Sequence, residues 1–228
     1  MLLKNYDRIV FAGDSVTDMG STNPVGEGLF DNLGQSYVRR VDNLLGALLP
    51  QYRFRVTNSG ISGNTSRDLL ERFDRDVISL KPDVVSIMIG INDVWRQFDT
   101  PAAFDNQVMP GEYEQNLREM ITKAKACARA VVLMTPYYME INPEDAMRAR
   151  MDQYGDICRQ LAKEYELPFV DLQQVFNDYF RTIDEGGNYT HHSTYIAWDR
   201  IHPNQVGATL IAKAFLEACG LKLSLTQK

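Results

Sequence analysis

Cysteine is scarce in this chain. The 228 residues include only three cysteines, at wide spacings, and the number is odd. Such a set excludes the paired disulfide framework of a small secreted domain. Widely spaced thiols inside or at the end of helical patterns are typical of a protein in a reducing compartment. The three residues are Cys127, Cys158 and Cys219.

Long hydrophobic runs are also lacking. Nowhere do about 18 apolar residues follow one another, as a membrane-spanning helix requires. The segment 1–8 has too short an apolar stretch before its charges to act as a secretory signal. Together with the cysteine content, these absences predict a cytoplasmic protein with no membrane partner.

Charge of one sign is not concentrated anywhere. The net charge is −6, and it is spread without a long run of either sign. A protein that binds nucleic acid needs a basic surface, so no nucleic-acid partner is expected. The length suits one domain that spans residues 1–228. The sequence leaves open whether the chain forms a homo-oligomer.

Short apolar runs rich in β-branched residues alternate with longer amphipathic stretches. This alternation is expected of parallel strands joined by crossover helices. It predicts an α/β fold, a three-layer α/β/α sandwich around a five-stranded parallel sheet. Segment 20–34 is predicted to form a long surface loop. The predicted strands are Arg8–Ala12, Arg53–Asn58, Val84–Ile89, Ala130–Thr135 and Pro168–Asp171, and the predicted helices are Ser36–Leu49, Ser66–Leu80, Glu112–Ala128, Ala146–Tyr165 and Gln205–Cys219.

Polar motifs follow the first three predicted strands. Residues 13–15 (Gly-Asp-Ser), 59–60 (Ser-Gly) and 90–93 (Gly-Ile-Asn-Asp) each come directly after a strand. Right-handed crossovers bring the carboxyl ends of parallel strands to one edge of the sheet, where ligands bind. The three loops are therefore expected to form one site.

Ser15 and the segment Asp199-Arg200-Ile201-His202 together could supply a nucleophile, a base and an acid. A serine hydroxyl needs an imidazole to take its proton and a carboxylate to orient that imidazole. Ser15 alone is equally typical of a helix N-cap, a role that is compatible with catalysis. Asp199 and His202 could also ligate a metal, but Pro203 and the lack of a third ligand nearby favour the catalytic pair.

Other polar residues near these motifs each allow two interpretations. Asn92 is either a turn residue or a donor to an oxyanion, and Gly60 either serves a tight turn or lets its N–H approach a substrate. Asp14 either braces its loop or is a solvated turn residue. The pair His191-His192 suggests a metal, but adjacent histidines in an extended segment point in opposite directions. No metal is expected.

The four motif blocks resemble the GDSL, or SGNH, esterases and lipases. The blocks are residues 13–15, 58–69, 88–98 and 197–203, and the likeness runs from Val10 to about Phe215. Within the family they are most similar to the intracellular acetylxylan and acetyl-xylooligosaccharide esterases. The Gly-x-Ser-x-Gly elbow of α/β-hydrolases is absent. The resemblance implies the flavodoxin-like SGNH hydrolase fold. It also implies that Ser15 is the nucleophile, that Asp199 and His202 are its acid and base, and that Ser15, Gly60 and Asn92 supply the oxyanion donors.

The resemblance further implies a serine esterase that removes acetyl groups from a small carbohydrate, such as a xylan-derived oligosaccharide, through an acyl-enzyme and without a cofactor. A tryptophan ring can stack on a sugar face or simply pack in the core. A lipid- or thioester-directed hydrolase and a non-catalytic protein that binds acylated sugars are the alternatives. Asp184–Tyr195 is longer than the family pattern, which leaves the substrate open. The candidate substrate-binding residues are Asp14, Asn64, Trp95 and Trp198.

Overall fold

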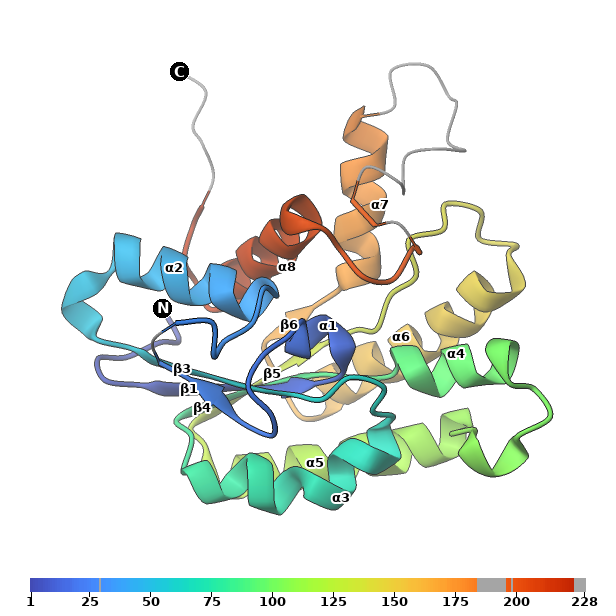
Figure 1. The fold of residues 1–228 in the computed structure, drawn as a ribbon, viewed down its shortest axis with the longest axis horizontal. Helices are drawn as coiled ribbons and strands as arrows, with labels where there is room; N and C mark the ends of the chain where they lie inside the picture. The colour runs from blue at the N-terminus through green and yellow to red at the C-terminus, as the bar shows by residue number, and fades with distance from the viewer. Residues whose placement is uncertain (29, 184–195, 198, 224–228) are drawn as a thin grey trace.

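The computed structural model describes residues 1–28, 30–183, 196–197 and 199–223. In this part of the chain, a six-stranded sheet has the order β2-β3-β1-β4-β5-β6 and carries helices on both faces (Figure 1). The α/β class is thereby confirmed. The strands are β1 (Arg8–Gly13), β2 (Gly26–Glu27), β3 (Arg55–Gly60), β4 (Val84–Met88), β5 (Ala130–Met134) and β6 (Phe169–Val170).

The prediction of a five-stranded parallel sheet needs one correction. All five predicted strands are present and parallel, but β2 adds a sixth strand that is antiparallel to β3. It forms inside segment 20–34, which was expected to be a loop. Only Gly26 and Glu27 pair with β3, and two residues are too few to show the alternation by which a strand is recognised in a sequence.

All five predicted helices are present, and the described residues contain three further α-helices that are not among the predictions. The extra ones are α1, α4 and α7. Each follows a strand of the sheet directly, and α1 and α4 lie in segments whose polar motifs suggested loops. The predicted helix 66–80 is divided at Val77 into α3 and a 3₁₀ turn at Ile78–Leu80. The α-helices are α1 (Ser15–Asp18), α2 (Tyr37–Leu48), α3 (Ser66–Asp76), α4 (Ile91–Asp99), α5 (Pro110–Cys127), α6 (Ala146–Glu164), α7 (Leu172–Ile183) and α8 (Gln205–Ala218), with further 3₁₀ turns at Pro50–Tyr52 and Phe104–Asn106.

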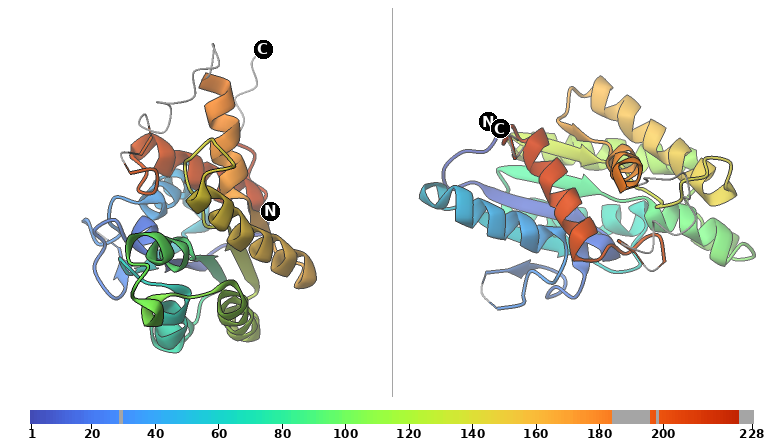
Figure 2. Two further views of the ribbon diagram at one scale, coloured as in Figure 1. Left: turned by 90° about the vertical axis from the view of Figure 1, so that its right-hand side faces the viewer. Right: turned by 90° about the horizontal axis from the view of Figure 1, so that it is seen from above.

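Two layers of helices enclose the sheet. Helices α2 and α8 pack on each other over one face, whereas α3, α5 and α6 pack side by side on the opposite face (Figures 1 and 2). The central strand β1 is apolar on both sides, as a strand between two layers must be. Phe11 lies 5.6 Å from the Tyr37 ring of α2 and 4.8 Å from the Phe215 ring of α8, between ring centroids. No helix in the described residues is long and apolar enough to cross a membrane.

The strand order places a topological switch point next to Ser15. From β1 the chain crosses to β3 on one side, and it then returns to β4 on the other side of β1. Counting the parallel strands alone, this is the flavodoxin-like order, in which ligands bind where the direction reverses. The segments after β1 and β4 therefore diverge around a crevice. The first begins with Ser15 and the second carries Asn92.

Candidate active site

Ser15 is the first residue of the short helix α1. The N-cap is Asp14, whose Oδ1 accepts a hydrogen bond from the Val16 N–H at 3.0 Å, so the cap role considered for Ser15 belongs to its neighbour. The half-buried Ser15 keeps its hydroxyl for other contacts. Its own N–H has no acceptor within the described residues, as is usual for the first N–H of a helix.

The structure brings Ser15, His202 and Asp199 together. Ser15 Oγ lies 2.8 Å from His202 Nε2, and His202 Nδ1 lies 2.5 Å from Asp199 Oδ2. When Nδ1 donates its proton to Asp199, Nε2 is left as an acceptor for the Ser15 hydroxyl. This tautomer has the geometry that a general base requires.

Asp199 is held in its ionised form. Its Oδ1 accepts hydrogen bonds from the N–H groups of Ile201 at 2.9 Å and His202 at 2.7 Å. Burial alone would raise the pKa of Asp199, but the bonds from the His202 ring and from these two N–H groups outweigh burial and lower the pKa. The carboxylate can therefore orient the imidazole and stabilise its protonated form.

The turn that carries this pair is fixed to the segment after β5. Arg200 has a φ of 65°, a left-handed conformation that is unusual for a side chain of this size. Its carbonyl accepts from the Met139 N–H at 2.9 Å, and its guanidinium pairs with Glu140 at 2.6 Å. The buried Tyr137 hydroxyl donates to the Ile201 carbonyl at 2.8 Å. These contacts offset the cost of the strained residue.

Asn92 lies in the first turn of α4 and is 2 % exposed. The preceding Gly90 has a φ of 126°, and a Cβ there would lie 2.8 Å from the Tyr113 hydroxyl, so the turn requires glycine. One N–H of the Asn92 amide donates to the Asn64 carbonyl at 2.9 Å. The second N–H remains for a ligand, because a side-chain amide has two donors.

The prediction that Gly60 is an oxyanion donor is wrong. Its N–H already donates to Asn58 Oδ1 at 2.9 Å, inside the buried end of β3. A Cβ at Gly60 would lie 2.4 Å from the Asp18 backbone nitrogen. Gly60 is therefore a glycine because helix α1 packs directly on this strand.

Gly63, which is not among the predicted site residues, presents the free N–H in this loop. It is exposed with a φ of 83°, and its N–H has no acceptor in the parts of the chain that the structure describes. Two contacts fix the loop beside Ser15. Ile61 N–H donates to the Gly13 carbonyl at 3.1 Å, and the Ser62 hydroxyl donates to the buried Asp18 at 2.6 Å. The second glycine of Gly-Ile-Ser-Gly, followed by Asn, is the signal that could have found it.

The substrate-binding prediction for Asp14 also needs correction. Its side chain is 0 % exposed and caps α1, so it braces the loop and offers no surface to a substrate. Asp14 Oδ2 is buried without a hydrogen-bond partner among the described residues. Burial raises the pKa of Asp14 to about 7, against smaller opposing effects from the Val16 N–H and from His202.

Of the remaining substrate-binding candidates, Trp95 lies beside His202 and Asn64 lies beside Asn92. The half-buried Trp95 ring is 6.2 Å from the His202 ring between centroids, tilted by 54°. The half-buried Asn64 accepts a hydrogen bond from Arg72 Nε at 2.6 Å through Oδ1. Trp198 and segment 184–195, which includes His191-His192, lie outside the described residues. Within those residues, no group of three or more His, Cys, Asp or Glu side chains could hold a metal ion.

Comparisons with known proteins agree with this geometry. Residues 11–210 match the model of the GDSL-like lipase/acylhydrolase family. The chain belongs to this family. It is 45 % identical, over 97 % of its length and 98 % of the relative's, to an acetylxylan esterase of Geobacillus stearothermophilus. The family prediction and the prediction of a carboxylic ester hydrolase are thus confirmed.

Solved structures extend the likeness to three dimensions. The crystal structure of the Geobacillus stearothermophilus acetylxylan esterase has a TM-score of 0.92 to this chain, at 44 % identity and full coverage of both chains. An α/β hydrolase from the metagenome of Lake Arreo has a TM-score of 0.90 at 45 % identity, with 96 % of this chain and 98 % of that chain covered. Catalytic mutants of the Geobacillus stearothermophilus enzyme replace a serine, an aspartate or a histidine by alanine.

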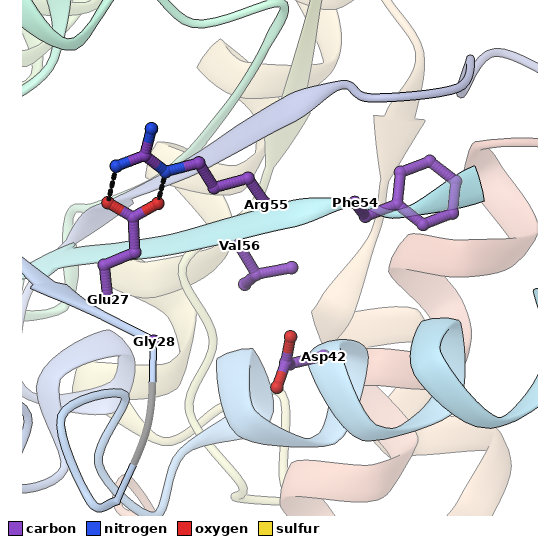
Figure 3. Close-up of a pocket in the computed structure, with 6 residues that line it drawn as sticks. All are labelled: Glu27, Gly28, Asp42, Phe54, Arg55 and Val56. Carbon is purple, nitrogen blue, oxygen red and sulfur yellow. Dashed lines mark hydrogen bonds and ion pairs between the residues drawn. The ribbon is translucent and has the colours of Figure 1, made fainter. Parts of the chain in front are cut away.

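Two cavities lie at different distances from Ser15, Asp199 and His202. A cavity of about 180 Å³ adjoins the site and is lined by Gly63, Thr65, Arg67, Asp68 and Arg96. A larger cavity, of about 580 Å³, lies near the amino end of β3, whereas Ser15 follows the carboxyl end of β1 (Figure 3). Its rim carries the ion pair of Glu27 and Arg55. The larger cavity is therefore remote from the nucleophile.

Proposed function

We propose that this protein is a serine esterase that removes acetyl groups from acetylated xylan-derived oligosaccharides. One observation carries the proposal. In a member of the GDSL-like acylhydrolase family, Ser15, His202 and Asp199 form a continuous chain with contacts of 2.8 Å and 2.5 Å. This series of hydrogen bonds can activate the Ser15 hydroxyl without a metal or a cofactor.

In the proposed mechanism Ser15 Oγ attacks the ester carbonyl carbon while His202 Nε2 takes the hydroxyl proton. The negative charge on the carbonyl oxygen is stabilised by the N–H groups of Ser15 and Gly63 and by the second N–H of the Asn92 amide. The protonated His202 then gives this proton to the sugar oxygen as its bond to the carbonyl carbon breaks, so the sugar leaves with a free hydroxyl. A water molecule, deprotonated by the same nitrogen, releases acetate from the Ser15 ester.

The choice of acyl group and alcohol is supported by the relatives. The acetylxylan esterase at 45 % identity covers 97 % of this chain, so the whole site is within the compared region. Trp95 beside His202 offers an apolar face on which a sugar ring could stack as the leaving group. A cytoplasmic location, predicted from the sequence, would suit oligosaccharides that have already been imported.

Labelling with a fluorophosphonate tests the nucleophile. The reagent should attach once, at Ser15, because only a serine activated by a base reacts readily with such electrophiles. Peptide mapping locates the adduct, and His202→Ala should abolish it. Ser62, an exposed serine in the neighbouring loop whose hydroxyl binds Asp18, is the internal control and should stay unlabelled. Attachment at Ser62, or labelling that survives His202→Ala, would contradict the mechanism.

Acetate release from acetylated xylo-oligosaccharides tests the substrate. We expect turnover on these sugars and a sharp loss of kcat/KM on aryl esters as the acyl chain grows beyond acetyl. Rates that rise with chain length would instead assign the site to lipids or thioesters. Sugar binding without acetate release would identify a non-catalytic binding protein.

A further inference from the structure

Asn92 can serve as an oxyanion donor in only one of two orientations of its amide. With the NH₂ group toward the site, it donates to the negative charge that develops on the substrate. A rotation by 180° would place the amide oxygen toward the site, where it would repel that charge. Packing alone barely distinguishes the two orientations, because the oxygen and the NH₂ group are similar in size. Hydrogen-bond partners must therefore fix the orientation.

Two partners fix it in this structure. The Asn64 carbonyl accepts from Asn92 Nδ2 at 2.9 Å, and Arg96 Nη2 donates to Asn92 Oδ1 at 3.3 Å. A carbonyl can only accept and a guanidinium can only donate. Rotation of the amide would therefore break both hydrogen bonds. It would place the amide oxygen against the Asn64 carbonyl and the amide NH₂ against the Arg96 guanidinium. Arg96 is one helical turn after Asn92 in α4, on the same face of the helix.

The Arg96 guanidinium is itself held in place. Its Nη1 pairs with Asp99, and its Cζ lies 5.6 Å from the centroid of the Trp95 ring, within the range of a cation–π contact. The side chain is 31 % exposed, and Asn92 is nearly buried. A charged donor on Oδ1 also draws electron density from the amide, which makes the opposite N–H a stronger donor.

We infer that Arg96 is a positioning residue for ester hydrolysis, which orients and polarises the Asn92 amide for the oxyanion. This inference rests on the proposed function, because it requires Asn92 to stabilise the transition state. Arg96 does not need to touch the substrate in this role. Its effect should appear in kcat and should require the Asn92 side chain.

A double-mutant cycle tests the inference on a small aryl acetate. Arg96→Met should lower kcat roughly tenfold, as for strongly coupled neighbours, with KM little changed. Asn92→Ala should lower kcat by roughly 10²–10³, the range for the loss of one oxyanion donor. In the Asn92→Ala background, Arg96→Met should cause no further loss. Arg96→Lys keeps the charge but not the planar fork, so it should restore only part of kcat.

Arg67→Met is the matched control for loss of a positive charge. Arg67 lines the same small cavity as Arg96, but its guanidinium binds Glu112 and the carbonyls of Asp105 and Gln107. It should leave kcat within about twofold of wild type, because its hydrogen bonds are made to residues other than Asn92. Thermal unfolding and circular dichroism verify that each variant folds.

The outcomes separate the inference from the proposed function. If Asn92→Ala leaves kcat unchanged, the oxyanion role of Asn92 fails. If Asn92→Ala lowers kcat but Arg96→Met lowers it equally in both backgrounds, only the Arg96 role fails. A rise in KM alone would make Arg96 a substrate-binding residue. An equal loss of kcat in Arg67→Met would mean that any positive charge near the site has this effect, and that Arg96 has no specific role in orienting Asn92.

If Arg96→Met does not fold, Arg96→Lys and Asp99→Asn replace it in the same cycle. Asp99→Asn should lower kcat only where the Asn92 side chain is present, because Asp99 holds the Arg96 guanidinium.

Discussion

The two halves of the candidate site are held in different ways. In the strand-end half, buried polar groups bind the ends of β1 and β3 together. Arg72, 6 % exposed, donates to the carbonyls of Gly13 and Ser59 at 3.0 Å each. Asp18 binds the loop that carries Gly63. In the turn half, residues 199–203 depend on a few contacts with the segment after β5. Ser15 therefore follows a strand end that many buried contacts hold, whereas His202 is positioned by a few contacts with one segment.

The largest effect is expected where the two halves meet, at the contact of Ser15 with His202. Ser15→Ala and His202→Ala should each lower kcat by about 10⁶, and the double variant should be no slower than either alone. Asp199→Asn should cost about 10⁴, since it leaves the imidazole in the wrong tautomer. Steady-state kinetics on an aryl acetate give these values. Multiplicative losses in the double variant would mean that the two residues act separately.

Much of this arrangement was predictable because the motifs follow strands. Ser15 and Asn92 come after buried apolar runs, and parallel strands with crossover helices bring such ends together. Asp199 and His202 were found through the nucleophile's chemical need for a base and an acid. Helix α4 differs from the prediction because its polar residues resemble those of a loop. The 3₁₀ turn after α3 differs because Ile78–Leu80 continue the apolar pattern of the predicted helix.

The choice between Gly60 and Gly63 could not be made from local sequence. Both glycines follow the same predicted strand, and both could serve a turn. What separates them depends on tertiary contacts. The carbonyls of Thr17 and Leu33 accept from the Asn58 side chain, whose Oδ1 accepts from the Gly60 N–H, and α1 packs against Gly60. Likewise, the solvated and bracing interpretations of Asp14 differ only in burial, which depends on the layers that cover it.

The second largest effect is expected on stability, where replacing Gly60 should destabilise the fold more than replacing Gly63. Gly60→Ala should destabilise the fold by more than about 3 kcal/mol, because backbone atoms of α1 would have to move away from the new Cβ. Gly63→Ala should cost only about 1–2 kcal/mol, for a side chain at positive φ in open space. Urea unfolding measures both. Similar losses would show that the strand-end half is less tightly packed than the structure indicates.

A third effect concerns the pH dependence of the strand-end half. Burial raises the pKa of Asp93 to about 7, despite hydrogen bonds from the Ser66 hydroxyl and N–H, as it does for Asp14. Both groups therefore bind protons in the folded state at pH values where they are ionised in the unfolded chain. Because the folded state holds more protons, stability should fall as pH rises from about 4 to 7.

Asp93→Asn isolates one of these groups. Between pH 4.5 and 6.5, the free energy of unfolding of the wild type should fall relative to that of the variant by about 1.4 kcal/mol per pH unit. Asp199 does not interfere, since its lowered pKa acts below this window. Urea unfolding at several pH values gives the comparison. Parallel curves would show that Asp93 titrates alike in the folded and unfolded states.

The smallest effect should come from the turn half, through Tyr137→Phe. Loss of the hydroxyl leaves the buried Ile201 carbonyl without its 2.8 Å donor, which should cost about 1–3 kcal/mol in stability. The change also loosens the turn next to His202, so kcat should fall by a few fold, well under the roughly 10²-fold loss of an oxyanion donor. Tyr154→Phe is the matched control. Its equally buried hydroxyl donates to the Val108 carbonyl at 2.5 Å and accepts from Gln97 Nε2 at 2.8 Å, away from the turn. Tyr154→Phe should lower stability by a similar amount and leave kcat unchanged. If the two variants lose kcat equally, the turn is positioned by the fold as a whole and the contrast between the halves disappears.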